Sequence, residues 1–482
     1  MTTPRTCQFA VIGGGPAGLA AATLAAALGI DTVLLDEQPT PGGQAYRNIE
    51  AVSRGSTGLL KILGKHYRHG SALVEAFRQS GARYEPSSSV WQVTQNGKIG
   101  VSQSGQAYLL QAERVLIATG AVERPVPVPG WTLPGVMTAG AVQTLMKAAG
   151  IVPDEDTVLA GSGPLIYLVA LQLIAAGAPL RAILQTQRPT SWFSKIRLLS
   201  QVRAGAGDML DGLKWIRAIK SSGVSVFHAS DIRAEGQHRL EAVIFQSRGR
   251  RHRMDASALL LHEGVIPNIQ LTASLRCAHR WDEAQVAWAP VLDQWGTTSH
   301  ESIAVAGDGA GTRGAKAAPH SGRLAALETA FRLGRLSMKE RDRLATSEKQ
   351  VLARQVGLRS LLDHLYSPSE AIRTPADADI VCRCEEVSAG EIRQLIDGQG
   401  FVELNQLKSQ SRCGMGQCQG RMCGQTIARI LAERRGLSMK DAGYFRLRIP
   451  VKPLPLEQLA HLQNVEYDRG PSASSGDPSQ RV

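Results

Sequence analysis

Residues 9–37 read FAVIGGGPAGLAAATLAAALGIDTVLLDE, and this stretch decides the fold of the first part of the chain. The apolar run before the glycines predicts a buried strand, the alanine-rich run after them a helix, and residues 32–35 a second strand. The spacing G-x-G-x-x-G is supplied by Gly13, Gly15 and Gly18. The first glycine allows a tight turn, the second lets the backbone approach a pyrophosphate, and the third lets the helix pack closely on the strand. The free N–H groups of the helix N-terminus favour phosphate, so this order predicts a dinucleotide-binding βαβ unit.

An acidic pair ends the second strand. Asp36 and Glu37 stand at about the distance from the glycines at which a carboxylate meets the ribose hydroxyls of an adenosine. Asp36 is the first candidate for this contact and Glu37 the second. A glycine motif alone also occurs in tight turns of other α/β proteins, but here strand, turn, helix, strand and acid follow in order. This order favours nucleotide binding.

Composition and charge indicate the number of domains and the kind of partner. The chain has 482 residues with 43% hydrophobic content, which predicts about three globular domains. The net charge is +12, and its densest cluster, residues 248–253, lies between two strand-like runs, as in a solvated hairpin tip. Aromatic residues make up only 5%, and no recognition helix or stacking motif is visible, so no nucleic-acid partner is expected. An anionic protein partner fits the charge better. The basic stretch 192–223 is predicted to be helical, either as a docking surface or as a solvated face.

Neither export nor a membrane span is expected. The first strand begins a few residues after Met1, without a basic region or a cleavage site before it, which predicts a cytoplasmic protein. The two longest apolar runs, 9–30 and 158–179, are each interrupted by Gly-x-Gly-Pro. This pattern fits a strand, turn and helix better than a spanning helix.

Three later motifs complete the first nucleotide site. A Pro-Gly-Gly-Gln turn occupies 41–44, an apolar strand ends in Ala-Thr-Gly at 118–120, and Gly-Asp at 307–308 precedes a helix near 322–333. With the glycine motif, they resemble the FAD oxidoreductases that have two dinucleotide-binding domains. In that group the aspartate hydrogen-bonds the ribityl chain of FAD. The resemblance implies that FAD is held by Gly13, Gly15, Pro16, Ala17, Gly18, Asp36, Glu37, Gly43, Gln44, Thr119, Gly120, Gly307 and Asp308.

A second glycine motif departs from the nucleotide-binding pattern. Residues 161–166 read GSGPLI, so Ile166 replaces the third glycine. A β-branched residue there pushes the helix from the strand and crowds the turn. The next strand, 181–184, runs into Gln-Thr-Gln-Arg without a carboxylate, although Arg188 has the charge to meet a 2′-phosphate. We therefore expect a domain kept for structure or for another ligand rather than an NAD(P)H site. Thiol–disulfide chemistry at the flavin is also not expected, because no cysteine lies between Cys7 and Cys277.

Cysteines gather near the C-terminus. Five of the seven lie between Cys382 and Cys423, and such clustering without an export signal points to a metal site. The close pairs Cys382/Cys384 and Cys418/Cys423 are separated by about thirty residues that contain a predicted helix, 389–397. The pattern resembles the [2Fe-2S] domain of bacterioferritin-associated ferredoxin (BFD), with these four as ligands. Structural zinc and free thiols are the alternatives, but zinc sites favour two-residue gaps. Cys413 has no place in this set.

The order of these parts along residues 5–440 resembles the large (α) subunit of heteromeric amino-acid dehydrogenases, a group with the opine oxidases, hydrogen cyanide synthase, and the proline and D-hydroxyproline dehydrogenases. It implies an α/β fold: an FAD-binding Rossmann-like domain, an inserted NAD(P)-type Rossmann-like domain, and a small helical, Cys-rich [2Fe-2S] domain. The expected units are FAD domain 1–130, degenerate second domain 131–264, FAD domain 265–335, helical linker 336–376, [2Fe-2S] domain 377–440, and a partly disordered extension 441–482.

The resemblance also implies partners. A separate β subunit, an amino-acid-oxidase-like flavoprotein, oxidises the substrate C–N bond; a small ferredoxin-like γ chain can be present, and FMN can lie between subunits. The chain is then an electron relay with FAD and a [2Fe-2S] cluster, with possible peripheral association with a quinone-reducing chain. The rivals are a self-contained NAD(P)H reductase and a non-catalytic iron–sulfur module. No proton-transfer catalyst is predicted, and His320 fits a helix start or a surface position.

Overall fold

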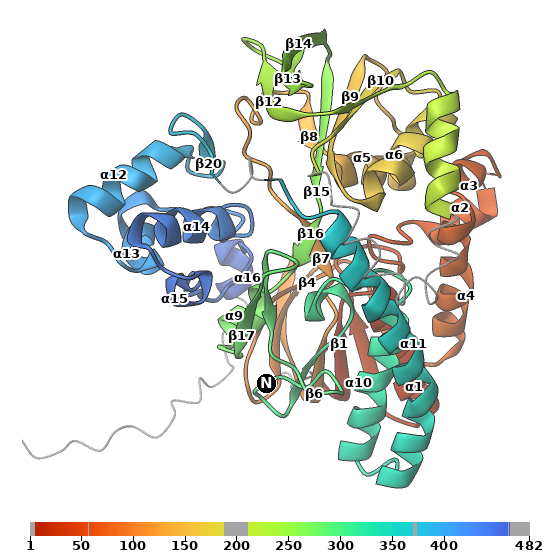
Figure 1. Cartoon of the computed structure of the whole chain (residues 1–482). Helices are drawn as coiled ribbons and strands as arrows, with labels where there is room; N and C mark the ends of the chain where they lie inside the picture. Colours follow the sequence, from red (N-terminus) through yellow and green to blue (C-terminus); the bar gives the residue numbers. More distant parts are fainter. Residues whose placement is uncertain (1–4, 56, 188–210, 370–373, 461, 463–482) are drawn as a thin grey trace, which may run out of the picture.

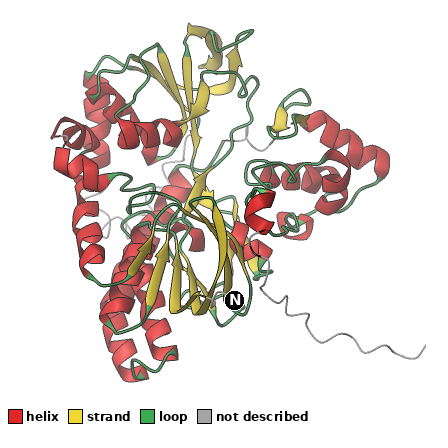
Figure 2. Ribbon diagram, turned by 180° about the vertical axis from the view of Figure 1, so that it is seen from behind, coloured by secondary structure: helices red, strands yellow, loops and turns green. Residues whose placement is uncertain are grey.

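The computed structural model describes residues 5–55, 57–187, 211–369, 374–460 and 462. Two α/β units stand one above the other in Figure 1, and a helical C-terminal unit lies beside them. Figure 2 shows the same arrangement from behind, with the strands gathered in the two α/β units. The α/β class and the Rossmann-type sheets are confirmed.

The first sheet has the strand order β3-β2-β1-β6-β5-β4, and β19 also pairs with β6. Strand β1 is parallel to β2 and β6, whereas β4, β5 and β6 form an antiparallel meander. The weak alternation of residues 88–112, broken by Gly and Asn, predicts such a meander. The strand bounds are β1 Arg5–Ile12, β2 Thr32–Leu35, β3 Arg83–Glu85, β4 Ser88–Val93, β5 Lys98–Gln103, β6 Gln106–Ile117 and β19 Ile303–Val305.

Small residues let the helices approach this sheet and each other. Helix α1 (Pro16–Ala27) packs on α10 (Ala318–Arg332), and a Cβ at Gly322 would lie 2.1 Å from the carbonyl oxygen of Ala17. The remaining helices of this unit are α2 (Ile49–Gly55), α3 (Thr57–Leu63) and α4 (Lys65–Gln79). The sequence predicts a helical stretch at 60–81, and the structure divides it between two helices. The chain breaks at Gly64, whose φ of 80° no helix adopts.

An antiparallel pair, β7 (Ala121–Glu123) and β16 (Val265–Pro267), carries the chain into and out of the second unit. Its parallel sheet has the order β11-β10-β9-β15-β8. The bounds are β8 Val136–Thr138, α5 Ala139–Ala149, β9 Thr157–Ser162, α6 Pro164–Ala175, β10 Leu180–Gln185, β11 Ser225–His228 and β15 Ala258–Glu263.

The basic cluster at 248–253 lies in a second, antiparallel sheet of this unit: β12 (Ser230–Glu235), β13 (Ala242–Ser247) and β14 (Arg250–Asp255). Most of its charges line β14, and only Arg248 is in the turn, so the hairpin-tip prediction is wrong in detail. Strand β14 is at the edge of this sheet, and its side chains are exposed or half-buried. The predicted helical stretch 192–223 lies partly outside the described residues.

The chain returns through short elements and then becomes helical. These elements are α9 Gln270–Ser274, β17 His279–Asp282, β18 Ala287–Pro290 and the 3₁₀ turn η1 Gly307–Ala310. The predicted charged helices of 335–375 form one 28-residue helix, α11 (Met338–Leu365), started by a capping box of Ser337 and Glu340. The C-terminal unit comprises β20 Ile380–Cys382, β21 Val387–Ser388, α12 Ala389–Gln399, α13 Leu404–Ser411, α14 Gly424–Arg435 and α15 Met439–Ala442. A last short helix, α16 (Leu456–Ala460), follows.

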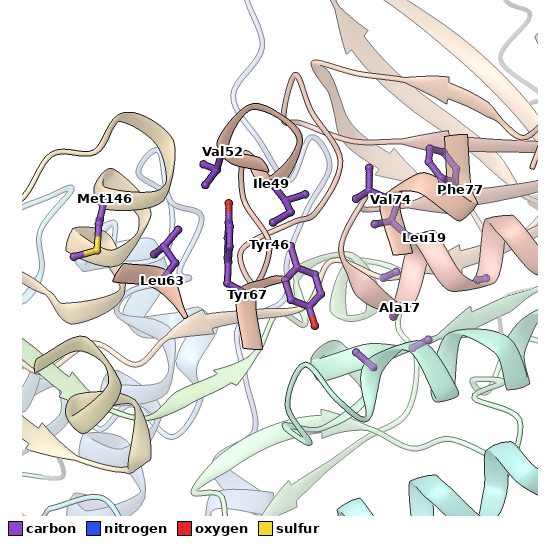
Figure 3. Packing of buried hydrophobic residues seen from close by; sticks show 14 of the residues in the cluster. Ala17, Leu19, Tyr46, Ile49, Val52, Leu63, Tyr67, Val74, Phe77 and Met146 are labelled. Atoms are coloured by element: carbon purple, nitrogen blue, oxygen red, sulfur yellow. The ribbon is translucent and has the colours of Figure 1, made fainter. Parts of the chain in front are cut away.

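One hydrophobic core runs through both nucleotide-type units. Figure 3 shows Tyr46 and Tyr67 between Met146 of α5 and Leu19 of α1. The two tyrosine rings meet edge to face with centroids 6.5 Å apart. The second unit is therefore packed firmly on the first. No helix within the described ranges has the length and apolarity needed to cross a bilayer.

Candidate functional site

A cavity of about 300 Å³ opens at the carboxyl ends of β1 and β2, where the first glycine turn lies. The topology places a ligand there, because the chain crosses to opposite sides of the sheet at β1. Of the thirteen residues expected at FAD, twelve line this cavity: Gly13, Gly15, Pro16, Ala17, Asp36, Glu37, Gly43, Gln44, Thr119, Gly120, Gly307 and Asp308.

The thirteenth, Gly18, lies behind the lining. A Cβ there would stand 1.9 Å from the carbonyl oxygen of Gly13, so α1 packs on the turn only with glycine at this position. Gly13 itself has a φ of 110°. Gly13 thus forms the tight turn and Gly18 allows the close helix packing that the motif predicts.

Asp36 is the acidic residue buried at the floor of the cavity. It is 7% exposed, and its Oδ2 has no hydrogen-bond partner among the described residues. Burial raises the pKa of Asp36 to about 6, although the N–H groups of Gln38, which donates to Oδ1 at 3.2 Å, and of Gly14 oppose the shift. A buried, unpaired carboxylate oxygen is costly, and a ribose hydroxyl is a donor that satisfies it. Glu37 is more exposed and pairs with Lys452.

The Gly-Asp motif is held from two sides. Asp308 Oδ1 accepts hydrogen bonds from the N–H groups of Arg313 at 2.8 Å and Gly314 at 2.7 Å. Gly307 has a φ of 71°, and a Cβ there would stand 3.0 Å from that of Ala17. The loop with Gly43 closes on the first turn, because a Cβ at Gly43 would lie 2.6 Å from Gly15 Cα. Unpaired carboxylate, glycine cradle and oriented aspartate together fit the adenosine, pyrophosphate and ribityl parts of FAD.

The structure adds cavity residues that the sequence did not indicate. Arg47 and Lys452 bring positive charge near Asp36, and Asn268 and Gln270 come from the segment after β16. Arg421, from the cysteine-rich domain, also lines the cavity. Arg421 and Lys452 have no local signal, since they lie more than a hundred residues beyond the last motif of this site.

The five clustered cysteines come together in the C-terminal unit. Cys382, at the end of β20, Cys413 and Cys423, just before α14, are each at most 1% exposed, whereas Cys384 is exposed. The thiol of Cys382 contacts those of Cys413 and Cys423, which lower the pKa of Cys382, and Cys384 contacts Cys418. Thiolates distributed over two groups fit a two-iron cluster better than one zinc ion.

Glycines shape the cysteine loops. A Cβ at Gly416 would stand 2.3 Å from that of Cys384, and Gly414 and Gly420, with φ of 82° and 80°, lie under Phe445. The loop backbone thus approaches Cys384 closely only because residue 416 is glycine. Cys413 lies within the contact set, so the ligand set Cys382, Cys384, Cys418 and Cys423 stays a prediction.

The loop 418–423 joins the two candidate sites. Its Arg421 lines the FAD cavity, while Cys418 and Cys423 flank it in the chain. Tyr444 Oη donates to the carbonyl oxygen of Gly420 at 3.2 Å, and the Gln425 amide donates to that of Val286 in the FAD domain. Trp131 Nε1 also donates to the carbonyl oxygen of Ile380 at 2.7 Å. The cysteine domain is thus docked with its cysteine loop toward the cavity.

Side chains after the second glycine motif bond within the protein, beside a cavity of about 320 Å³ that Thr186 and Glu263 line. Thr186 Oγ1 donates to buried Glu263 at 2.6 Å, and Gln185 Nε2 donates to Tyr167 Oη at 2.9 Å. These are the side chains at the end of β10, where a nucleotide ribose would be held. Ile166 is fully buried in the core behind the turn. Arg188 lies outside the described residues. His320 contacts Glu348 Oε2 through Nδ1 at 2.6 Å, a structural pairing between α10 and α11.

Comparisons with known proteins agree with this geometry. The family "Pyridine nucleotide-disulphide oxidoreductase" matches residues 7–334, and "BFD-like [2Fe-2S] binding domain" matches residues 380–433. An opine oxidase subunit of Rhizobium meliloti is 42% identical over 94% of this chain and 87% of its own length. The chain belongs to this family of opine oxidase subunits. The resemblance stated from the motifs is confirmed, as are FAD oxidoreductase character and the [2Fe-2S] domain.

More distant relatives extend over the same length. Hydrogen cyanide synthase subunit HcnB of Pseudomonas aeruginosa is 32% identical over 94% of this chain and 98% of its own length. The L-proline dehydrogenase structure from P. horikoshii covers 95% of this chain and 80% of its own, with a TM-score of 0.68 at 19% identity. This likeness confirms the fold alone.

The raised pKa of Asp36 predicts that FAD binding depends on pH. Ribose hydroxyls donate to the ionised carboxylate, so binding favours that form and holds its pKa below that of the empty site. The affinity for FAD is therefore greatest above about pH 6 and falls as the pH drops through that value. Fluorescence titration of the apoprotein with FAD between pH 5 and 8 measures this. Asp36→Asn should bind more weakly at pH 8 and lose the slope; a wild-type slope in this variant contradicts the assignment.

Proposed function

We propose that this chain is the FAD- and [2Fe-2S]-containing electron-transfer subunit of a heteromeric amino-acid dehydrogenase. One observation carries the proposal: loop 418–423 supplies two of the expected cluster ligands and, through Arg421, a wall of the FAD cavity. A one-electron centre and a flavin held this way exchange electrons over a short distance without moving domains.

The residues of this chain bind and orient. Asp36 accepts from the adenosine ribose, the first glycine turn and the α1 N-terminus hold the pyrophosphate, and Asp308 receives the ribityl hydroxyls. When bound, FAD converts between two-electron and one-electron transfer, and a [2Fe-2S] cluster carries one electron at a time. Arg421 adds a positive charge beside the cavity, which favours added electron density on the ligand there.

Substrate oxidation belongs to a partner in this proposal. The names of the relatives, opine oxidase and hydrogen cyanide synthase subunits, describe proteins of several chains. We infer an amino-acid-oxidase-like flavoprotein as the β subunit, acting on an opine, proline or D-hydroxyproline type of substrate. A small ferredoxin-like γ subunit and FMN at a subunit interface extend the same proposal, with the assembly in the cytoplasm and peripheral to a quinone-reducing chain.

An anaerobic titration with NADH and then NADPH tests the relay against the self-contained reductase. The purified chain should keep an oxidised flavin spectrum with both nicotinamides, because Ile166 replaces the third glycine and no carboxylate follows β10 to hold a ribose. Dithionite should still bleach it. Mixing with an amino-acid-oxidase-like β subunit, plus the amino acid, should then reduce the flavin. Bleaching by micromolar NADH or NADPH alone would put the stand-alone reductase first, and absence of flavin from the purified chain would favour the non-catalytic module.

A further inference from the structure

The chain after the cysteine-rich domain returns to the FAD domain. We call residues 444–460 the strap. Its first part belongs to the cysteine domain, where Phe445 and Leu447 are buried in the core. Its second part crosses the first sheet: Val451 is buried in the core of the FAD domain, and its N–H donates to the carbonyl oxygen of Trp91 at 2.9 Å. Ser102 Oγ donates to Gln458 Oε1 at 2.5 Å near the end of the strap. Both ends are therefore fixed.

This course brings Lys452 to the acidic end of the FAD cavity. Val451 and Lys452 line the cavity together with Asp36 and Glu37, and the Lys452 ammonium group pairs with the Glu37 carboxylate. The Lys452 side chain is only 27% exposed. Burial lowers the pKa of Lys452 to about 8, while the nearby Asp36 carboxylate favours its charged form. A buried ammonium group is costly, so its position over two carboxylates is a specific feature of the site.

The charges explain why a cation is needed there. Asp36 suits a ribose, but two adjacent carboxylates repel the pyrophosphate, which is negatively charged in every dinucleotide. Arg47, from the loop before α2, lies on one side of Asp36, and Lys452 lies on the Glu37 side. The strap thereby neutralises the acidic end and covers it with Val451.

We propose that Lys452 is an FAD-binding residue, through which the strap holds the adenosine diphosphate half of the cofactor. The proposal rests on FAD as the occupant of the cavity. It adds that the segment joining the cysteine domain to the FAD domain is itself part of the cofactor site, so retention of FAD depends on a residue more than four hundred positions after the glycine turn.

The rate of FAD loss tests this in the full-length protein. Holoprotein is mixed with an excess of an apoflavoprotein that traps released FAD, and iron and sulfide are measured in the same samples. Lys452→Met should release FAD about tenfold faster, the effect of losing one charge-assisted contact, with unchanged iron and sulfide. Lys452→Arg should restore most of the retention. A chain ending at residue 462, which keeps the strap, should match the wild type.

Asp36→Asn separates the failure of this inference from that of the proposed function. If Asp36→Asn loses FAD quickly while Lys452→Met retains it at the wild-type rate, the role of Lys452 is overturned and the cavity assignment stands. If neither variant changes FAD retention, the cofactor does not occupy this cavity, and both proposals fall. Loss in both variants, with rescue by arginine, supports both.

Discussion

Cys382→Ser is expected to leave a protein that has FAD and no cluster. Cys382 is the buried centre of the cysteine set, in contact with two other thiols, and a hydroxyl does not replace a thiolate at iron. Cys382 does not line the FAD cavity, most of which is built from the other domain. Iron and sulfide should fall from two each per chain to near zero, with FAD close to one per chain. Metal analysis, absorbance and electron paramagnetic resonance after reduction measure the three quantities.

Cys413→Ser is the matched comparison, because Cys413 is as buried as Cys382 and contacts the Cys382 thiol. With Cys382, Cys384, Cys418 and Cys423 as ligands, this variant keeps the cluster and shows at most a shifted spectrum. A Cys413→Ser protein without iron, beside a Cys418→Ser protein with iron, would place Cys413 in the ligand set. One zinc per chain in the wild type, lost in Cys382→Ser, would revive the zinc interpretation.

The first nucleotide site could be predicted because its signals are local. Gly13, Gly15 and Gly18 lie within six residues, and each has a task that follows from backbone geometry alone. Asp36 is the buried residue of the acidic pair, and its ranking over Glu37 as the ribose contact stays a prediction. The meander of β4 to β6 could be predicted from periodicity because its strands pair with their neighbours in the sequence.

What escaped prediction depends on contacts between distant parts of the chain. Lys452 is an ordinary lysine in a proline-rich segment, and only the path of the strap brings it to Glu37. In the sequence, Arg421 is an ordinary loop residue between two cysteines. It lines the FAD cavity only because the cysteine domain is docked against the FAD domain. The missing acid after β10 suggested an impaired nicotinamide site, but the hydrogen bonds of Thr186 to Glu263 and of Gln185 to Tyr167 could not be predicted from the sequence. Such effects are tertiary, and propensity does not encode them.

These distant contacts have a common consequence for the mechanism. The second unit is fixed on the first through the core around Tyr46 and Tyr67, and Lys147 of α5 donates to the carbonyl oxygen of Gln44 in the FAD cavity loop at 2.9 Å. The cysteine domain is fixed through loop 418–423 and the strap. The second unit and the cysteine domain are thus both fixed to the FAD domain, which suits electron transfer over constant distances. A nicotinamide reductase, in contrast, must bind and release a large cofactor in each cycle.

Gly18→Val is expected to remove FAD binding and most of the stability of the first domain. The nearest atoms to a Cβ at this position are the Gly13 carbonyl oxygen, at 1.9 Å, and carbonyl carbon, at 3.1 Å, and Val11 Cγ1 is 3.2 Å away. Neither the turn nor α1 can move away, because α10 packs on the other side of α1. Overpacking at such a place costs about 3 kcal/mol, and any relief displaces the turn that receives the pyrophosphate. Thermal unfolding and bound FAD per chain measure the two effects.

Gly357→Ala is the matched control for Gly18→Val. It lies in α11, and a Cβ there meets no atom within 4 Å, so alanine should stabilise the helix by about 0.5–1 kcal/mol and leave FAD content unchanged. Iron and sulfide should persist in both variants, because the cysteine domain has its own core of α12, α13 and α14. A Gly18→Val protein with wild-type FAD content and melting temperature would show that α1 does not pack on the glycine turn as described, and the assignment of the cavity would lose its main geometric support.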